Sequence, residues 1–303
     1  MTRALPHPRS RAAPIAAFGT TFQNPILLAA GTAGFGREVA DVINLDGLGG
    51  IVTKAVSPEP RAGHPAPRVA EFPGGMLNAV GLANPGLEHV ATVDLPWLAR
   101  ALRRARVIVN VVGSVIGDYA AVVRRLANEA VVTAFELNVS CPNTARGGEE
   151  FGADDEVLGE LVRACRAATN RPLIAKLAPT LPDVARTAEA AVKAGADGIS
   201  VVNTMPGSLF DPDGHAAGRL GRARLGYGQG GVSGPALLPV GVLAVRRVVQ
   251  RVGCDVIGVG GVRRPEDVEQ YLEAGAVLVG VGTAALADPR VPERLAAAWS
   301  RRG

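Results

Sequence analysis

Short apolar runs rich in β-branched residues alternate with amphipathic stretches along nearly the whole chain. A short apolar run is typical of a buried strand, whereas apolar residues spaced three and four apart indicate a helix with one buried face. Eight runs are predicted to be strands: 25–30, 50–55, 107–112, 134–139, 172–177, 198–203, 255–260 and 276–281. Helical spacing is found in residues 118–130, 157–169, 183–196 and 265–276.

Strands that are apolar on both faces indicate a parallel sheet that helices cover on each side. Eight such strands with helices following them predict an α/β fold, a (β/α)8 TIM barrel in a single domain. A doubly wound open sheet is the alternative. Two segments, 56–85 and 204–234, are longer than ordinary loops. We expect both to be long insertions on the C-terminal face, where barrel enzymes carry their chemistry.

The first 20 residues are basic and interrupted by proline. They predict a loose N-terminal arm over 1–20 with a short strand near Ala17, followed by one catalytic barrel domain over 21–303. The arm has neither the apolar core of a secretory signal nor the pattern of a membrane anchor. Elsewhere no apolar run approaches the roughly 18 to 20 residues that a spanning helix needs, so we expect no membrane contact.

Charge and cysteine content narrow the possible functions further. The net charge is +4, but the arginines are scattered over helix-like segments, which favours solvated helix faces over a nucleic-acid groove. The three cysteines, Cys141, Cys165 and Cys254, are an odd number without zinc-like spacing, and this favours free thiols in the reducing cytoplasm. The four histidines show no metal-ligand spacing either, so no metal site is expected.

Lysine is rare in this chain, since only three of the 32 basic residues are lysine. Two of them, Lys54 and Lys176, fall at the C-terminal ends of predicted strands. A position that keeps an ammonium group where arginine is usual is expected to need its compact point charge. We therefore interpret Lys54 and Lys176 as ligand-binding residues and Lys193 as a surface residue. Chance placement is the alternative.

Asparagines are also concentrated at strand ends. Five of the ten lie at or just beyond such ends: Asn78, Asn110, Asn138, Asn143 and Asn203. Each amide offers two donors and one acceptor oxygen, so a ring of amides suits a planar heterocycle such as a pyrimidine or a flavin. The alternative is that asparagine simply favours loops and turns.

Glycines follow the seventh and eighth predicted strands, in GVGGVRRPED and GVGTAALADP. Glycine lets backbone N–H groups approach a phosphate closely, and barrels frequently bind phosphate at this place. The pattern predicts a phosphorylated ligand, although glycine also occurs where a strand merely ends.

Cys141 lies in the stretch FELNVSCPNT, two residues past the fourth predicted strand. On the predicted catalytic face, neighbouring polar groups could hold its thiol ready as a base or nucleophile. A lone loop cysteine is more often inert, but the surrounding lysines and asparagines favour a functional role. Cys165 on a helix and Cys254 at a strand start are interpreted as packing residues.

Together and in order, these motifs resemble the dihydroorotate dehydrogenases, FMN enzymes of pyrimidine synthesis. The matching runs are NPILLAAGTAGFG, PGGMLNAVGLANPG, ELNVSCPNT, AKLAP, VVNT, GGVSGPA, GVGGV and GVGTA, from about residue 20 onward. The cysteine in SCPN is similar to class 1 enzymes, most of all to the NAD-linked class 1B catalytic subunit. The resemblance implies oxidation of (S)-dihydroorotate to orotate in de novo UMP synthesis.

The resemblance also implies a role for each matching position. Cys141 would remove a proton from C5 of dihydroorotate while hydride leaves C6 for the flavin, and Lys54 would lie near the substrate carboxylate. Substrate binding would involve Lys54, Asn78, Ala79, Val80, Gly81, Leu82, Asn138, Asn143, Asn203 and Thr204. FMN binding would involve Ala30, Gly31, Lys54, Ala55, Asn110, Asn138, Lys176, Val202, Gly234, Gly260, Gly261, Gly282 and Thr283, the last four around the phosphate.

Electron transfer to NAD is expected to need a partner. The chain has no Gly-x-Gly-x-x-Gly strand-to-helix fingerprint, and its three cysteines cannot supply the four thiolates that usually hold an iron–sulfur cluster. For class 1B, the resemblance implies an electron-transfer subunit that carries FAD and a 2Fe–2S cluster. It also implies a homodimeric core.

Two departures from the family pattern flank the expected site. Ala178 and Thr180 stand where polar groups are common in the family, and the insertion over 210–231 is longer than usual. They leave open a related dihydropyrimidine as substrate. The motifs are also compatible with a fumarate-linked class 1A enzyme, or with a flavin-binding barrel that only carries electrons. His215 in the insertion is expected to face solvent.

Overall fold

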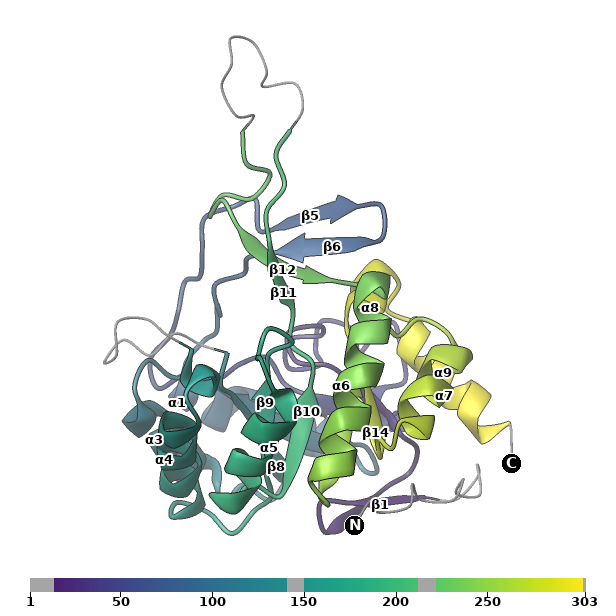
Figure 1. Cartoon of the computed structure of the whole chain (residues 1–303). Helices are drawn as coiled ribbons and strands as arrows, with labels where there is room; N and C mark the ends of the chain where they lie inside the picture. The colour runs from purple at the N-terminus through teal and green to yellow at the C-terminus, as the bar shows by residue number, and fades with distance from the viewer. Residues whose placement is uncertain (1–13, 141–149, 212–221, 302–303) are drawn as a thin grey trace.

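The chain forms a closed barrel of eight parallel strands surrounded by helices (Figure 1). In this computed structural model, the described residues are 14–140, 150–211 and 222–301. The barrel strands are β3 (Ile26–Leu28), β4 (Gly50–Val52), β7 (Arg106–Val111), β8 (Val132–Asn138), β9 (Leu173–Leu177), β10 (Gly198–Val201), β13 (Asp255–Val259) and β14 (Leu278–Val281). Each pairs with the next, and β14 pairs with β3. The eight predicted strands and the TIM barrel are confirmed, and the open sheet is wrong.

The helices cover the outside of the barrel. They are α1 (Leu87–His89), α2 (Leu95–Ala101), α3 (Ile116–Leu126), α4 (Asp155–Arg166), α5 (Val184–Lys193), α6 (Leu238–Arg251), α7 (Pro265–Glu273), α8 (Thr283–Ala287) and α9 (Val291–Ser300). Asp154 and Asp183 accept hydrogen bonds from the first backbone N–H groups of α4 and α5, and so fix where these helices begin. The four predicted helical segments correspond to α3, α4, α5 and α7.

The expectation of a helix after every strand is wrong at β3. Between β3 and β4 the chain forms turns and one short 3-10 helix, Leu45–Gly47. Gly34 and Gly36 have φ angles of 52° and 94°, a left-handed conformation that breaks a helix. The carbonyl of Gly34 accepts a hydrogen bond from the backbone N–H of Lys54 over 2.8 Å. The segment therefore crosses the end of the neighbouring strand β4 instead of leaving it as a helix.

A hairpin closes the N-terminal end of the barrel. Its strands, β1 (Ile15–Ala17) and β2 (Thr20–Phe22), pair antiparallel, and β1 lies at the lower end of the molecule in Figure 1. The side chains of Phe18 and Phe22 are 5% and 0% exposed. They belong to an apolar cluster with inward-facing barrel residues, among them Leu27, Ile108, Ala134, Ile174, Ile257 and Leu278. The strand expected near Ala17 is present and packs against the barrel.

The two insertions meet in one sheet at the opposite end of the barrel. The first contains β5 (Val69–Phe72) and β6 (Gly75–Asn78), and the second contains β11 (Met205–Gly207) and β12 (Gly230–Ser233). These strands form an antiparallel sheet in the order β11–β12–β6–β5, above the C-terminal end of the barrel (Figure 1). The placement of the insertions on this face is confirmed. Their pairing with each other was not predicted.

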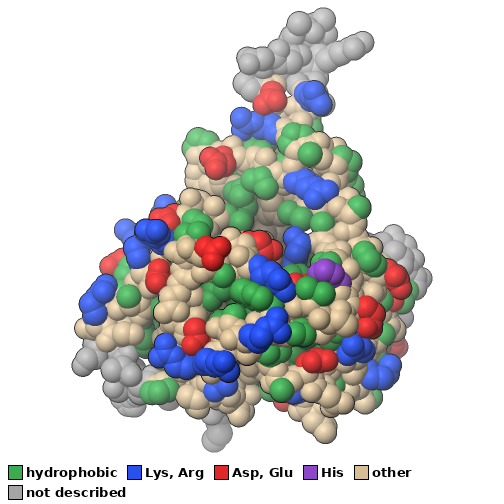
Figure 2. Space-filling view, turned by 180° about the vertical axis from the view of Figure 1, so that it is seen from behind, with side chains coloured by type: hydrophobic (Ala, Val, Ile, Leu, Met, Phe, Trp, Pro, Cys, Tyr) green, Lys and Arg blue, Asp and Glu red, His purple; other side chains and the backbone are tan. Residues whose placement is uncertain are grey.

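The surface mixes charged and apolar side chains. Figure 2 shows Lys and Arg side chains dispersed among acidic and apolar ones over the rear face. In the part of the chain that the structure describes, no helix combines the length and the apolar character needed to cross a membrane.

Candidate active site

The side chains inside the barrel change from apolar to polar within two residues. Asn110, Glu136 and Lys176 each lie two positions after a residue of the apolar cluster at the N-terminal end. Those apolar residues are Ile108, Ala134 and Ile174. Alternate residues of a strand point to the same side, so the three polar side chains also point into the barrel, nearer its C-terminal mouth.

These three side chains form a buried polar cluster. Asn110, Glu136 and Lys176 are 0%, 2% and 7% exposed. Asn110 Nδ2 donates to Glu136 Oε1 over 2.7 Å, and Lys176 Nζ lies 3.6 Å from the same oxygen. Ser200, which is opposite Lys176 in the β9–β10 register, has a buried hydroxyl without a partner among the described residues. Buried charges need such pairing, because an isolated buried charge is very costly.

Glu136 is absent from the expected site residues. The sequence does contain a signal for Glu136, because a carboxylate interrupts the apolar run AFELNV. Ala134 and Asn138, two positions before and after it, lie on the same face of the strand. An acidic residue on the inner face of a barrel strand must meet a cation or donors. Lys176 and Asn110 are those groups.

Polar residues extend from the barrel mouth to the antiparallel sheet, partly through hydrogen bonds and partly through packing. Asn203 Nδ2 donates to Asn138 Oδ1 over 3.2 Å, and Asn203 Oδ1 accepts from the backbone N–H of Thr204 over 2.9 Å. Thr204 lies against Gly231, where a Cβ would come within 2.0 Å of the threonine hydroxyl. Asn78 Nδ2 donates to the carbonyl of Gly231 over 3.1 Å. The structure thus brings together four of the expected substrate-binding residues.

Lys54 lies two residues past the end of β4 and is partly buried. Besides its bond to Gly34, its backbone is fixed through Thr53, whose hydroxyl donates to the Lys54 carbonyl over 2.9 Å. The same hydroxyl accepts from the backbone N–H of Asn110 over 3.2 Å. Thr53 was not expected, but it aligns Lys54 with the buried cluster.

The loop after β6 turns back toward the barrel. Gly81 and Leu82 have positive φ angles of 71° and 56°, and the Leu82 side chain packs against Ala55. A Cβ at Gly81 would come within 2.5 Å of the backbone nitrogen of His64, which donates to the carbonyl of Val80 over 3.2 Å. Ala79 is buried in the sheet. The expected residues of this loop therefore border the mouth beside Ala55.

Glycines follow three neighbouring strands at the mouth, and those after β3 and β14 leave open backbone. A Cβ at Gly31, which follows Ala30, would have no atom within 4 Å, and one at Gly282 would have none closer than 3.8 Å. Gly260 and Gly261 have φ angles of 122° and 76°, which side chains rarely tolerate. Because β13, β14 and β3 are neighbours in the barrel, these glycines lie side by side. Thr283 begins α8 directly after Gly282.

Two further residues hold the loop between β13 and α7. The Tyr271 hydroxyl donates to the carbonyl of Gly260 over 2.7 Å, and burial raises the pKa of this phenol, so it stays protonated. Asp267 Oδ2 accepts from the backbone N–H groups of Arg263 and Arg264 over 2.9 and 3.1 Å. Neither residue was expected from the sequence, although Asp267 occupies the third position of a helix that begins with proline.

Several expected residues lie further from this network or outside the described residues. Cys141 and Asn143 lie outside them, as does His215. Val202 is buried and its backbone N–H donates to the carbonyl of Val259, and Gly234 packs against the backbone of Gly75. Of the two departures, Ala178 is buried directly after β9 and Thr180 is exposed.

The two described cysteines are packing residues, as predicted. Burial raises the pKa of the Cys165 thiol to about 12 and that of the Cys254 thiol to about 11. Both are free thiols and stay protonated at neutral pH. Lys193 is also confirmed as a surface residue, with a side chain that is 73% exposed.

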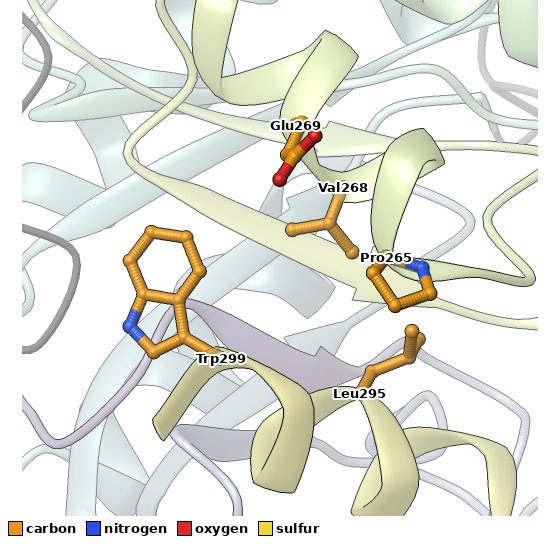
Figure 3. A pocket seen from close by; sticks show the side chains of 5 residues that line it. All are labelled: Pro265, Val268, Glu269, Leu295 and Trp299. Atoms are coloured by element: carbon orange, nitrogen blue, oxygen red, sulfur yellow. The ribbon is translucent and has the colours of Figure 1, made fainter. Parts of the chain in front are cut away.

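A separate pocket lies between α7 and α9, on the outside of the barrel (Figure 3). Its lining consists of Pro265, Val268, Glu269, Leu295 and Trp299. With a volume of about 10 Å³ it has room for about one water molecule. The pocket is too small for an organic cofactor, and its lining contains none of the polar residues of the barrel mouth.

The chain is similar to known proteins in both sequence and fold. Residues 14–300 match the family named dihydroorotate dehydrogenase. Catalytic subunits of dihydroorotate dehydrogenase B (NAD(+)) from Anoxybacillus flavithermus and Geobacillus kaustophilus are 42% and 43% identical over 273 residues, which is 90% of this chain and 85% of each relative. The fold is shared, at a TM-score of 0.74, with a DHODH from Eimeria tenella, solved in complex with ferulenol. That protein is 22% identical, and the match covers 97% of this chain and 85% of that one. The resemblance found in the motifs is confirmed, and the chain belongs to the dihydroorotate dehydrogenase family.

Proposed function

We propose that this chain is the catalytic subunit of an FMN-dependent enzyme that oxidises (S)-dihydroorotate to orotate in UMP synthesis and passes the electrons to NAD through a partner. One observation carries the proposal: the amides of Asn138 and Asn203 are hydrogen-bonded to each other beside the buried cluster around Lys176, and the amide of Asn78 is held on Gly231 of the sheet above the mouth. Family membership and the names of the relatives support the substrate.

The residues at the mouth fit a bound FMN. Open backbone at Gly31 and Gly282 leaves space for a planar ring and a phosphate, and the Gly260 loop can present N–H groups to that phosphate. Asn110 Oδ1 is buried without a partner among the described residues, so it is available to a ligand N–H. When bound, FMN supplies the acceptor for the hydride that leaves C6. Lys176 would hold positive charge beside its electron-rich edge.

The chain's own residues would bind and orient the substrate. Dihydroorotate carries a carboxylate and a ring edge on which N–H and C=O groups alternate. The Lys54 ammonium would pair with the carboxylate through charge-assisted hydrogen bonds. Amides can donate and accept at once, so Asn78 and Asn203 suit the ring edge. Because each amide is already held by a hydrogen bond, Asn78 to Gly231 and Asn203 to Asn138, the substrate would meet a preorganised site.

Cys141 would take the proton from C5 of the substrate as general base. It follows directly on Ser140, which comes two residues after the end of β8. Positioned bases contribute about 10² to 10⁴-fold to a rate. The deprotonated thiol of a loop cysteine is a suitable base, whereas the thiols of Cys165 and Cys254 are held protonated by burial.

A spectroscopic experiment tests cofactor and substrate together. The purified chain should show the visible absorption of a flavin, and anaerobic dihydroorotate should bleach it. Dihydrouracil, which lacks the carboxylate that Lys54 would pair with, is the control and should reduce the flavin far more slowly. A chain that binds no flavin, or a flavin that dihydroorotate leaves oxidised, would contradict the proposal.

The proposed partner would be an electron-transfer subunit with FAD and a 2Fe–2S cluster. The words "catalytic subunit" and "NAD(+)" in the names of the relatives support it. The isolated chain should reduce an artificial dye with dihydroorotate, yet reduce NAD⁺ negligibly until the partner is added. Brisk reduction of fumarate by the isolated chain would instead indicate a class 1A enzyme. Free thiols at Cys165 and Cys254 support a cytoplasmic location, and a homodimeric core stays a prediction.

A further inference from the structure

Glu136 is the central residue of the buried cluster. Its carboxylate is 2% exposed, and one oxygen, Oε1, faces both Asn110 Nδ2 at 2.7 Å and Lys176 Nζ at 3.6 Å. The three residues come from neighbouring strands, β7, β8 and β9, and all point into the barrel. A buried ion pair is often no more stable than apolar side chains of similar volume. Stability alone therefore gives little reason for a carboxylate at this position.

The carboxylate fixes the orientation of the Asn110 amide. An ionised carboxylate can only accept hydrogen bonds, so the NH2 group of Asn110 must face Glu136. Asn110 Oδ1 then points away, and it is buried without a partner among the described residues. The amide consequently offers an acceptor to a ligand. The oxidised flavin ring has a single ring N–H group, between its two carbonyls, and this is the kind of donor that such an acceptor fits.

The carboxylate also sets the charge of the cluster. The 3.6 Å separation from Lys176 Nζ is a charge contact and too long for a hydrogen bond, so the ammonium keeps donors for a ligand. Lys176 and Glu136 together carry no net charge. A reduced flavin gains negative charge, which Lys176 attracts and Glu136 repels. Glu136 therefore moderates the preference of the site for the reduced cofactor.

We propose that Glu136 is a positioning residue of the flavin site, which orients Asn110 and counterbalances Lys176, and so sets how much more tightly the site binds reduced than oxidised FMN. The inference rests on the proposed FMN-dependent function. The inference adds Glu136 to the proposed site, as a residue that would act through Asn110 and Lys176.

Replacement of the carboxylate by an amide of the same size tests the proposal. In Glu136→Gln the negative charge is lost and the shape is kept, so the preference for reduced over oxidised FMN should rise about tenfold. For a two-electron couple, a tenfold change raises the midpoint potential by about 30 mV. The potential is measured by anaerobic titration against a reference dye, and FMN affinity by fluorescence. Glu136→Asp keeps the charge and should shift the potential less than Glu136→Gln.

Glu189→Gln is the matched control. Glu189 also pairs with a lysine, Lys193, at 2.9 Å, but on the outer surface of α5. Its loss should leave the potential unchanged, whereas a general effect of lost ion pairs would move both. If Glu136→Gln does not fold, the midpoint potential of FMN in Glu136→Asp decides instead. A shift of about 30 mV or more would count against the charge argument. A smaller shift together with weaker FMN binding would support it.

The outcomes separate the proposed function from the role of Glu136. A wild-type chain that binds no FMN would overturn the proposed function and this inference together. A wild-type chain that binds FMN, with a potential that Glu136→Gln leaves unchanged or lowers, would overturn only the role of Glu136.

Discussion

The two ends of the barrel are built from the same strands, yet they differ in what their inner side chains do. At the N-terminal end, the β1–β2 hairpin inserts Phe18 and Phe22 into a cluster made up of hydrophobic side chains. At the C-terminal mouth, two residues further along β8 and β9, the inner positions hold the buried charges of Glu136 and Lys176. Apolar burial stabilises a fold, whereas buried charges cost free energy unless they are paired. The N-terminal end is therefore built for stability, whereas the mouth carries polar groups suited to a ligand, which is the usual division in this fold.

The largest effect is expected for Cys141→Ala, which removes the proposed general base. Loss of a general base should lower the rate of flavin reduction by dihydroorotate about 10² to 10⁴-fold. The free energy of unfolding should change by no more than about 0.5 kcal/mol, as for most substitutions that leave the core intact. Stopped-flow absorbance measures the rate, and urea unfolding measures the stability.

Cys254→Ala is the control for this prediction. Cys254 immediately precedes β13 at the other end of the barrel, and burial raises the pKa of its thiol to about 11. Its removal should leave the rate of flavin reduction unchanged. Cys141→Ser should keep slight activity that rises with pH, because a hydroxyl is a weaker acid than a thiol. Undiminished flavin reduction in Cys141→Ala would remove Cys141 from the mechanism.

Phe22→Ala should produce the converse result at the N-terminal end. Removal of a fully buried phenylalanine typically costs about 3–5 kcal/mol of unfolding free energy. The FMN midpoint potential of the folded fraction should stay at the wild-type value, because the mouth is untouched. Phe210→Ala is the control, since Phe210 is 48% exposed and its loss should change stability by about 0.5 kcal/mol or less. A shifted potential in Phe22→Ala would show that the two ends are not independent.

Lys54→Ala should weaken orotate binding without unfolding the protein. Hydrogen bonds to charged groups contribute about 1.5–3 kcal/mol, which corresponds to roughly 10- to 100-fold in affinity. Titration of orotate into the oxidised protein, followed by the flavin spectrum, measures this. Lys193→Ala removes an exposed lysine on α5 and should bind orotate as the wild type does. Equal affinity in wild type and Lys54→Ala would contradict the assignment.

The smallest effect concerns Asp46 at the N-terminal end. Its Oδ1 accepts from the backbone N–H groups of Arg103, Arg104 and Ala105 at 2.7–3.0 Å. Partial burial raises the pKa of Asp46, but these donors and the Arg104 charge outweigh it, so the pKa lies below its ordinary value of 3.8. A carboxyl whose pKa is lowered by folding stabilises the folded protein. This contribution is fully present when the pH is above the ordinary pKa, and it is lost as the pH falls through the lowered pKa.

Asp46→Ala should therefore lose about 1 kcal/mol of unfolding free energy at neutral pH. The loss should shrink as the pH falls below about 3.8, because the wild type then loses the same contribution. Thermal unfolding at a series of pH values measures the difference. A destabilisation that is the same at every pH would mean that the charge of Asp46 contributes nothing.

Local patterns predicted most of the barrel because each strand is a short apolar run that can be recognised without knowledge of the distant residues that bury it. The exception after β3 has a local cause too, since Gly34 and Gly36 adopt backbone conformations that end a helix. Rare lysines and clustered asparagines located the mouth, where the structure places Lys54, Lys176 and the hydrogen-bonded amides of Asn138 and Asn203. These predictions depended on composition and strand ends, both of which are visible in the sequence.

The remaining features depend on contacts between distant segments. Asn78 and Gly231 pair in the antiparallel sheet although they are 153 positions apart. No local periodicity encodes such a pairing. Glu136 is different, because the alternation along β8 places it on the inner face together with Ala134 and Asn138. What the sequence did not show is that Lys176, on the next strand, lies close enough to balance its charge.

The pairing of β6 with β12 limits how this protein can change in evolution. Successive residues of a strand face opposite sides, so one extra residue within either strand would turn Asn78 away from the mouth. A gain or loss of one residue within Gly75–Asn78 or Gly230–Ser233 would therefore disturb the site. Four of the eight barrel strands separate the two insertions along the chain, so this constraint joins positions that lie far apart in the gene.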